Sequence, residues 1–464
     1  MLTSWINALL VCVPIGLTLN RVYGNSPATF AVNYLAEVPL WFMCDYALEE
    51  MEKYLPRTIS DLLDICTNNT VQLISSILLL KRGEVALLQT SLVGGILSNI
   101  LVLLGLSLLS GGMSNHTQRF NRTGAQGSSS LLSIAATSVL IPTAEKELGQ
   151  ITADNLVLQS RGIAVVLLFI YFTYTFCQMY THKEEYQDWG TSASHQHAAP
   201  GHAHAHAGHG ARGPDGHLAD NGRVFDRLVM QMTVQAAIPA IEPVMRRNAH
   251  SLPVMVDSVK VPRATCVERE TTTATATAAV SSEYMPAYGP SAEILGPQLH
   301  LAVATAVFAA AAVLLFLCID ATVDSLSAMT GEDQAGLSPT FVGLILLPVP
   351  NYDFAAVSLA ADDYLGQAFK YTVGRSIQTA LLVLPLVVLM AWGMHVDGGV
   401  SLALDGFEVV SLFTTILLLN FLVVDAKVHW VHGVLLLADW VLIAIAAYFV
   451  SPVRLGSEPP TSPS

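Results

Sequence analysis

Polar residues interrupt long apolar runs at two places in the second half of this sequence. In residues 337–392, apolar runs at 340–348 and 379–392 enclose a polar break at Asn351, Tyr352 and Asp353 and a second break at 374–378. Polar groups in apolar surroundings cost several kcal/mol each unless a partner satisfies them. We therefore expect these side chains either to bind something or to pack against one another.

The first half contains a similar block in residues 60–112. Asn69 and Gln72 lie near its first polar break, and Gly94 lies in its second. Gly94 follows Asn69 by 25 positions, and Gly374 follows Asn351 by 23 positions. Two hydrophobic blocks that are interrupted at corresponding places are typical of an internally duplicated transporter with its ion site at the repeat interface.

The first block predicts a core helix over residues 60–80. Asp64, Asn68 and Gln72 recur every four residues and so share one face of that helix. Asp320 and Asp324 likewise share a face near the end of an apolar helix over 301–325. Polar side chains in a membrane span tend to face the protein interior or a water-filled cavity.

The composition indicates an all-α polytopic membrane protein. Apolar residues make up 52% of the 464 residues and charged residues 12%, about half the charged share of a soluble domain. The first apolar run, which begins at residue 4, is interpreted as a membrane span rather than a signal peptide, because further spans follow. Runs long enough to span a membrane number about eleven: 4–20, 27–45, 59–80, 86–110, 128–145, 161–181, 298–320, 338–360, 366–394, 401–423 and 429–450.

The charge pattern excludes a nucleic-acid partner, because the net charge is −14 and no basic stripe exists. A long segment, 182–297, separates the two halves and contains a His-rich tract. The tract either chelates a metal weakly through His202, His204, His206 and His209 or forms part of a disordered linker. The tail at 453–464 is rich in Pro and Ser and is predicted to be disordered.

Outside the middle segment, the chain resembles the vacuolar-type calcium/proton exchangers of the calcium/cation antiporter superfamily. The segments LSPTFVGLILLPV and SIQTALLVLPLVV, residues 87–112, and FLVVDAKVHWVHGVLLLADWVLIAIA carry the resemblance. It implies eleven spans, arranged as an extra first helix at 1–22 and two inverted repeats of five helices at 23–181 and 298–452.

The resemblance also implies a function and a site. Exchangers of this family are secondary transporters rather than enzymes; they need no cofactor and exchange Ca²⁺ for protons across the vacuolar or another endomembrane. Their glutamates, in Gly-Asn-Ala-x-Glu motifs, bind either Ca²⁺ or a proton, which couples the two fluxes. The expected partners are therefore divalent cations, protons and membrane lipid. Matching positions put the ion and proton site at Asn69, Gln72, Ser98, Asn99, Asp320, Asn351, Asp353, Ser376 and Gln378.

Three positions within the matched motifs depart from the family pattern. Gln72 stands where the first motif has its glutamate, and an amide cannot take up or release a proton. Asp353 is the nearest carboxylate in the second motif, within Pro350-Asn351-Tyr352-Asp353-Phe354. Arg375 takes the place of a serine in the second Gly-Ser-type motif.

These departures leave two interpretations open. The protein is a divalent cation/proton antiporter that uses Asp353, Asp320 or Asp64 as substitute carboxylates. Alternatively, it is a transport-inactive homologue with a structural or metal-sensing role, in which Arg375 pairs with Asp353 and occupies the ion site. A third possibility for Arg375 alone is that its side chain extends from a helix end to the membrane interface.

Overall fold

Apolar segments of the chain form helices in the computed structural model, which describes residues 5–114, 118–119, 121–181, 299–330, 336–395, 399–425 and 427–450. The predicted linker with its histidine tract and the predicted tail lie outside the described residues. The division of the chain at the predicted domain boundaries therefore stays a prediction.

The first half is a series of antiparallel helices. Ser26 caps the second of them by accepting a hydrogen bond from the Thr29 amide, with Pro27 at the first helical position. The elements are η1 (Trp5–Val11), α1 (Cys12–Tyr23), α2 (Pro27–Glu52), α3 (Arg57–Thr67), α4 (Thr70–Lys81), α5 (Val85–Leu97), η2 (Ser98–Leu103), α6 (Leu104–Ser114), α7 (Arg122–Glu147), α8 (Ala153–Phe176) and η3 (Cys177–Thr181).

The second half repeats the same kinds of element. They are α11 (Leu301–Asp324), α12 (Ser327–Thr330), α13 (Pro339–Phe341), η6 (Val342–Leu346), η7 (Val349–Asn351), α14 (Ala355–Ala361), α15 (Leu365–Gln378), η8 (Thr379–Val383), α16 (Leu384–Gly393), α17 (Gly406–Asp425) and α18 (Trp430–Phe449). One antiparallel pair of two-residue strands, β1 (Gln118–Arg119) and β2 (Lys427–Val428), joins the halves at one end of the bundle. The fold is otherwise helical, as the sequence predicts.

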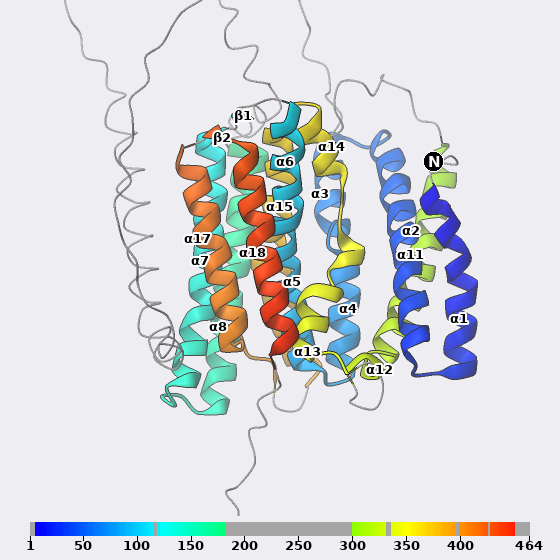
Figure 1. Ribbon diagram of the computed structural model, residues 1–464, viewed down its shortest axis with the longest axis horizontal. Coiled ribbons are helices and arrows are strands. Elements are labelled where there is room, and N and C mark those ends of the chain that lie inside the picture. The colour runs from blue at the N-terminus through cyan, green and yellow to red at the C-terminus, as the bar shows by residue number, and fades with distance from the viewer. Residues whose placement is uncertain are drawn as a thin grey trace, which may run out of the picture.

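The two halves run in opposite directions through the bundle. The broken helix α3–α4 descends in Figure 1 from the end that carries the strands, whereas the corresponding segment from α13 to α14 ascends toward that end. The helix predicted over 60–80 is not continuous, because Asn68 and Asn69 form a turn between α3 and α4. Its counterpart bends by 65° between Pro339–Asn351 and Ala355–Ala361.

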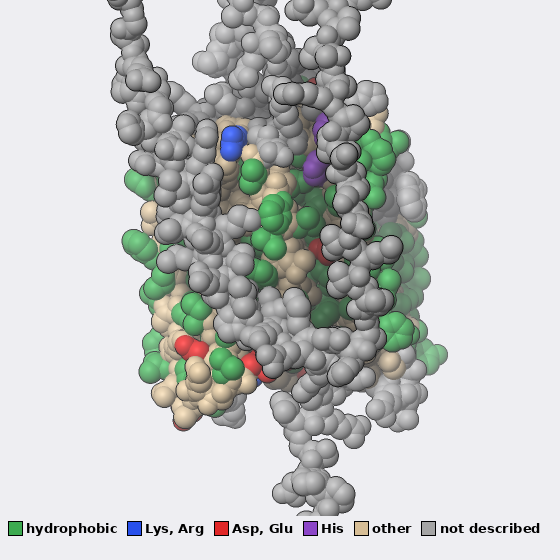
Figure 2. All heavy atoms as spheres, turned by 60° about the vertical axis from the view of Figure 1, so that its left-hand side comes forward, with side chains coloured by type: hydrophobic (Ala, Val, Ile, Leu, Met, Phe, Trp, Pro, Cys, Tyr) green, Lys and Arg blue, Asp and Glu red, His purple; other side chains and the backbone are tan. Residues whose placement is uncertain are grey.

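Eight helical segments in the described part of the chain are long and apolar enough to cross a membrane, or nine if the bent pair forms one span. The expected total of eleven therefore stays a prediction. Apolar side chains such as Phe169, Phe172 and Leu442 are exposed on the outside of the bundle, as a lipid-facing surface requires. In Figure 2, hydrophobic side chains cover much of the visible lateral face, and most visible charged groups lie near its two ends.

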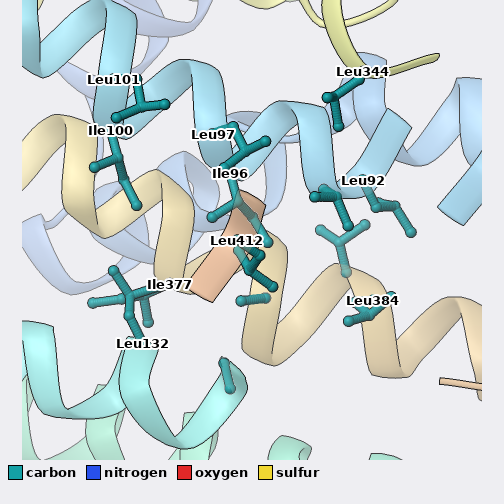
Figure 3. Close-up of a cluster of buried hydrophobic side chains, with 14 of the residues drawn as sticks. Leu92, Ile96, Leu97, Ile100, Leu101, Leu132, Leu344, Ile377, Leu384 and Leu412 are labelled. Carbon is teal, nitrogen blue, oxygen red and sulfur yellow. The ribbon is translucent and has the colours of Figure 1, made fainter. Parts of the chain in front are cut away.

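The interior core joins both halves. Figure 3 shows Leu92 of α5 near Leu344 of η6 and Leu384 of α16, and Ile100 of η2 near Ile377 of α15. Gly94 makes the contact with η6 possible, because a Cβ atom at this position would lie 2.3 Å from the Leu344 carbonyl oxygen. The broken helix of the second half therefore packs directly on the backbone of α5.

We expect Gly94→Ala to destabilise the protein by about 1–3 kcal/mol, because the new methyl group meets main-chain atoms that can move only if η6 shifts. Gly374→Ala is the matched control, since nothing lies within 4 Å of the Cβ it would add. Thermal unfolding of both purified variants in detergent measures the difference. Equal unfolding temperatures for the two variants would contradict this account of the α5–η6 contact.

Candidate functional site

The polar breaks of the two halves meet inside the bundle. Asn69 Nδ2 donates a hydrogen bond of 2.8 Å to Gln378 Oε1, and Thr379 Oγ1 donates one of 3.3 Å to Asn69 Oδ1. Asn351 Nδ2 donates to Gln72 Oε1 at 3.4 Å. Each of these bonds joins the first half of the chain to the second. The structure thus brings together four of the residues expected at the site.

Most of the remaining contacts of the motif residues are hydrogen bonds to main-chain carbonyl groups of neighbouring helical segments. Gln72 Nε2 donates to the carbonyl and hydroxyl oxygens of Ser91, at 3.1 and 3.2 Å. Ser98 Oγ donates to the Gly94 carbonyl at 2.8 Å. Ser376 Oγ lies 3.5 Å from the Ile96 carbonyl, and Asn99 is 9% exposed.

A π-helical segment occupies the same place in both halves. One begins at Ser98 after α5, and the other begins at Thr379 after α15. A π-helical segment changes the register of the side chains that follow it and is frequent at functional sites. Both glycine-containing helices are therefore irregular where they face the breaks.

Arg375 connects the two breaks. Its Nη2 donates to the Asn68 carbonyl at 3.2 Å, and its Nη1 donates to the Asn351 carbonyl at 3.3 Å. Nη1 also lies 3.9 Å from Asp353 Oδ2. One guanidinium thus contacts main-chain groups of both broken helices and the carboxylate predicted to be its partner.

Arg375 is buried, with 4% of its surface exposed. Its guanidinium carbon lies 5.3 Å from the centre of the Trp41 ring and 5.4 Å from the centre of the Tyr371 ring. Both distances suit cation–π contact. The side chain therefore points into the protein, and the alternative in which it extends to the membrane interface is wrong.

Three carboxylates interact electrostatically with Arg375: Asp45 of α2, Asp64 of α3 and Asp353. Asp353 is 1% exposed, and its Oδ1 accepts a hydrogen bond from the Ala355 amide at 2.9 Å. Asp353 Oδ2 and Asn351 Oδ1 have no hydrogen-bond partner among the described residues. Within those residues, no group of three His, Cys, Asp or Glu side chains is placed to hold a metal ion in this conformation.

Asp320 does not join this cluster. Its carboxylate pairs with Arg82 at 2.7 Å, as does that of Asp324, and its side chain is 38% exposed. Arg82 follows the far end of α4, so at 1.5 Å per residue it stands about 20 Å along the helix from Asn69. Asp320 therefore takes part in an ion pair at the bundle surface. It lies away from the other residues that were predicted to form the ion and proton site.

Sequence reasoning missed three groups at the site: Asp45, Trp41 and Tyr371. Asp45 carried a signal, because it is an acidic residue at the end of the apolar run 27–45, and ionisable groups in membrane spans are usually functional. The two aromatic residues carried no signal, since aromatic side chains are common throughout membrane helices.

We expect Arg375→Gln to destabilise the protein by about 3–5 kcal/mol, because it leaves buried carboxylates without their cation. The loss should shrink as the pH falls, since protonation removes the unpaired negative charge. The double variant Arg375→Gln/Asp353→Asn should recover part of the stability. Thermal unfolding across a pH series measures all three effects, and a loss that did not change with pH would contradict the electrostatic explanation.

Comparison with known proteins agrees with this architecture. The sodium/calcium exchanger protein family matches residues 66–180 and 303–449, which leaves the middle segment unmatched. The chain is 30% identical to a vacuolar calcium ion transporter of Cryptococcus neoformans, over 96% of this chain and 74% of that protein. It is 27% identical to a vacuolar calcium ion transporter of Schizosaccharomyces pombe, over 97% and 86% of the two chains.

Solved structures share the fold. Native YfkE superposes with a TM-score of 0.63 at 20% identity, covering 96% of this chain and all of that chain. An H⁺/Ca²⁺ exchanger, CAX, superposes with a TM-score of 0.53 at 12% identity, over 96% and 91% of the two chains. With a family match over more than half of its length and a 30% identical relative, the chain belongs to the sodium/calcium exchanger family.

Proposed function

We propose that this protein exchanges Ca²⁺, or another divalent cation, for protons across the vacuolar membrane. The relatives named as vacuolar calcium transporters and Ca²⁺/H⁺ antiporters support this function. The observation that carries the proposal is the position of Asp353, which is buried where the breaks of the two halves meet. Alternating access needs its ion site at this interface.

The balance of charge at the cluster favours a divalent cation. The Arg375 guanidinium interacts electrostatically with the carboxylates of Asp45, Asp64 and Asp353. If all three carboxylates are ionised, two negative charges remain uncompensated. Either one divalent cation or two protons would neutralise them, and exchanging one for the other is the chemistry of an antiporter.

The oxygen atoms at the cluster also suit Ca²⁺, which binds carboxylate, amide and main-chain oxygens. Asp353 Oδ2 and Asn351 Oδ1 are buried without a hydrogen-bond partner in the described part of the chain. Gln72 Oε1 accepts only a long bond, of 3.4 Å, from Asn351. We propose these three oxygens as ligands, together with the carbonyl oxygens that Arg375 contacts in this conformation.

Arg375 then acts as a tethered cation that competes with the substrate. A unit charge 4 Å from the guanidinium would be repelled by about 4 kcal/mol at an effective dielectric constant of 20, and a divalent ion by more. The substrate therefore binds only after Arg375 moves away from Asp353. The main-chain and aromatic contacts of Arg375 hold it in place while the site lacks the ion.

A transport-inactive homologue, the alternative derived from the sequence, gains no support from the relatives, which are named as transporters. Arg375 does occupy the cluster, as that alternative expected. Its pairing with Asp353 is loose, however, because the 3.9 Å separation exceeds hydrogen-bond distance. Such a contact is compatible with displacement during a transport cycle.

We expect vesicles that contain the protein to take up ⁴⁵Ca²⁺ when a proton gradient that is acidic inside the vesicles is imposed. Asp353→Asn should reduce this uptake at least ten-fold, because an amide cannot exchange a proton for the cation. Asp320→Asn is the control and should retain uptake, since the exposed pair with Arg82 contributes only about 0–1 kcal/mol to stability.

Absence of uptake by folded wild-type protein would contradict the proposed function. If Gln72→Glu/Arg375→Ser then gained uptake, the inactive alternative would replace it. Unchanged uptake in Asp353→Asn would show that another group exchanges the proton.

A further inference from the structure

A second buried carboxyl group lies outside the Arg375 cluster. Glu37 is in the middle of α2, about 15 Å from one end of the helix and about 22 Å from the other at 1.5 Å per residue. It is 4% exposed. Its side chain faces α11, which packs along α2 at one side of the bundle in Figure 1. α2 belongs to the first half and α11 to the second, so Glu37 lies at a contact between the halves.

The hydrogen bonds around Glu37 favour a second proton, on its carboxyl group. Thr322 Oγ1 on α11 lies 2.5 Å from Glu37 Oε1 and 2.9 Å from the Cys318 carbonyl oxygen. A threonine hydroxyl has one proton to donate. If that proton goes to the Cys318 carbonyl, the shorter contact needs a proton on Glu37, which then donates to Thr322. A neutral carboxylic acid satisfies both contacts.

Among the residues that the structure describes, none near Glu37 compensates a negative charge. No Lys, Arg or His in the described ranges forms an ion pair with it; the pairs found there involve other carboxylates. The titratable groups beside it are Tyr34 on its own helix and Cys318 on α11, both neutral at physiological pH. An ionised carboxylate in this position would lose its hydration without gaining a cation.

Glu37 is also connected to the broken helix of the second half. Tyr34, one helical turn before Glu37, donates from its hydroxyl to the Leu346 carbonyl at 2.5 Å. Leu346 ends η6, five residues before Asn351. A movement of α2 away from α11 would therefore disturb both the Glu37–Thr322 contact and the segment that carries Asp353.

We propose that Glu37 is a proton-binding site, separate from the Asp353 cluster, with Thr322 as its hydrogen-bond partner. Glu37 holds its proton while α2 and α11 pack together, and releases it to water when these helices separate and the carboxyl group becomes hydrated. This inference rests on the proposed function to the extent that alternating access is what separates the helices. Its ligand is the proton, and its site is the contact between α2 and α11.

Infrared spectroscopy of the protein reconstituted in lipid vesicles tests the inference without measuring transport. A protonated carboxyl group gives a carbonyl stretching band that a carboxylate lacks. We expect the wild-type protein to show such a band at neutral pH and Glu37→Gln to remove a component of it, beside any contribution of the buried Glu408. Glu37→Asp should shift the band rather than abolish it, and Asp320→Asn should leave it unchanged because Asp320 is paired with Arg82.

Thr322 provides a second readout. Thr322→Val should shift the frequency of the Glu37 band, because the hydroxyl that accepts its proton is gone, and Thr322→Ser should restore the wild-type frequency. A difference spectrum between wild type and Glu37→Gln that contains no carbonyl band, or a Glu37 band that does not respond to Thr322→Val, would overturn the proposal. A Glu37 band in a protein that takes up no ⁴⁵Ca²⁺ would contradict only the proposed function, whereas normal uptake without that band would contradict only this inference.

Discussion

The contacts of the buried Arg375 guanidinium are the interaction on which the centre of this bundle depends. A break in a membrane helix leaves main-chain carbonyls without their helical donors, and lipid offers no replacement. Arg375 donates to one such carbonyl in each half, at Asn68 and at Asn351. The same group offsets the charge of nearby carboxylates. A single side chain thereby allows both helices to be broken and allows acidic residues to be buried beside the breaks.

The two halves are alike in backbone but differ in chemistry. Both contain a broken helix followed by a helix with a π-helical segment. The first half contributes an amide, Gln72, where the second half contributes Asp353 and Arg375. At the two breaks and in the glycine motifs, the fully charged groups therefore belong to the second half. The first half adds neutral oxygens there, and its Asp45 and Asp64 contribute carboxylates from the neighbouring helices. Inverted repeats explain the shared geometry. The different side chains explain why one break carries Asp353 whereas the other carries the neutral Gln72.

The sequence predicted the features that follow from local pattern. Apolar runs predicted the helices, and polar residues inside two of those runs predicted where the halves meet. It did not predict that α3 ends at Thr67, because the apolar and polar residues around Asn68 also fit an unbroken helix. It placed Asp320 in the site, since linear spacing cannot tell that Arg82, 238 positions away, pairs with this carboxylate at the surface. Asp45 and Glu37 were both acidic residues in an apolar run, but their partners come from other helices.

The two acidic positions respond to different events. Asp353 faces a guanidinium and oxygen ligands, so its protonation competes with binding of a cation. Glu37 contacts the Thr322 hydroxyl group and, in the described part of the chain, no cation. Its protonation therefore depends on whether water reaches the contact between α2 and α11. A proton at the first position reports the absence of the substrate cation, and a proton at the second reports the packing of the helices. Because Tyr34 joins α2 to the segment that leads to Asp353, the two events are mechanically linked, and proton uptake at Glu37 favours the packed arrangement in which Arg375 covers the site.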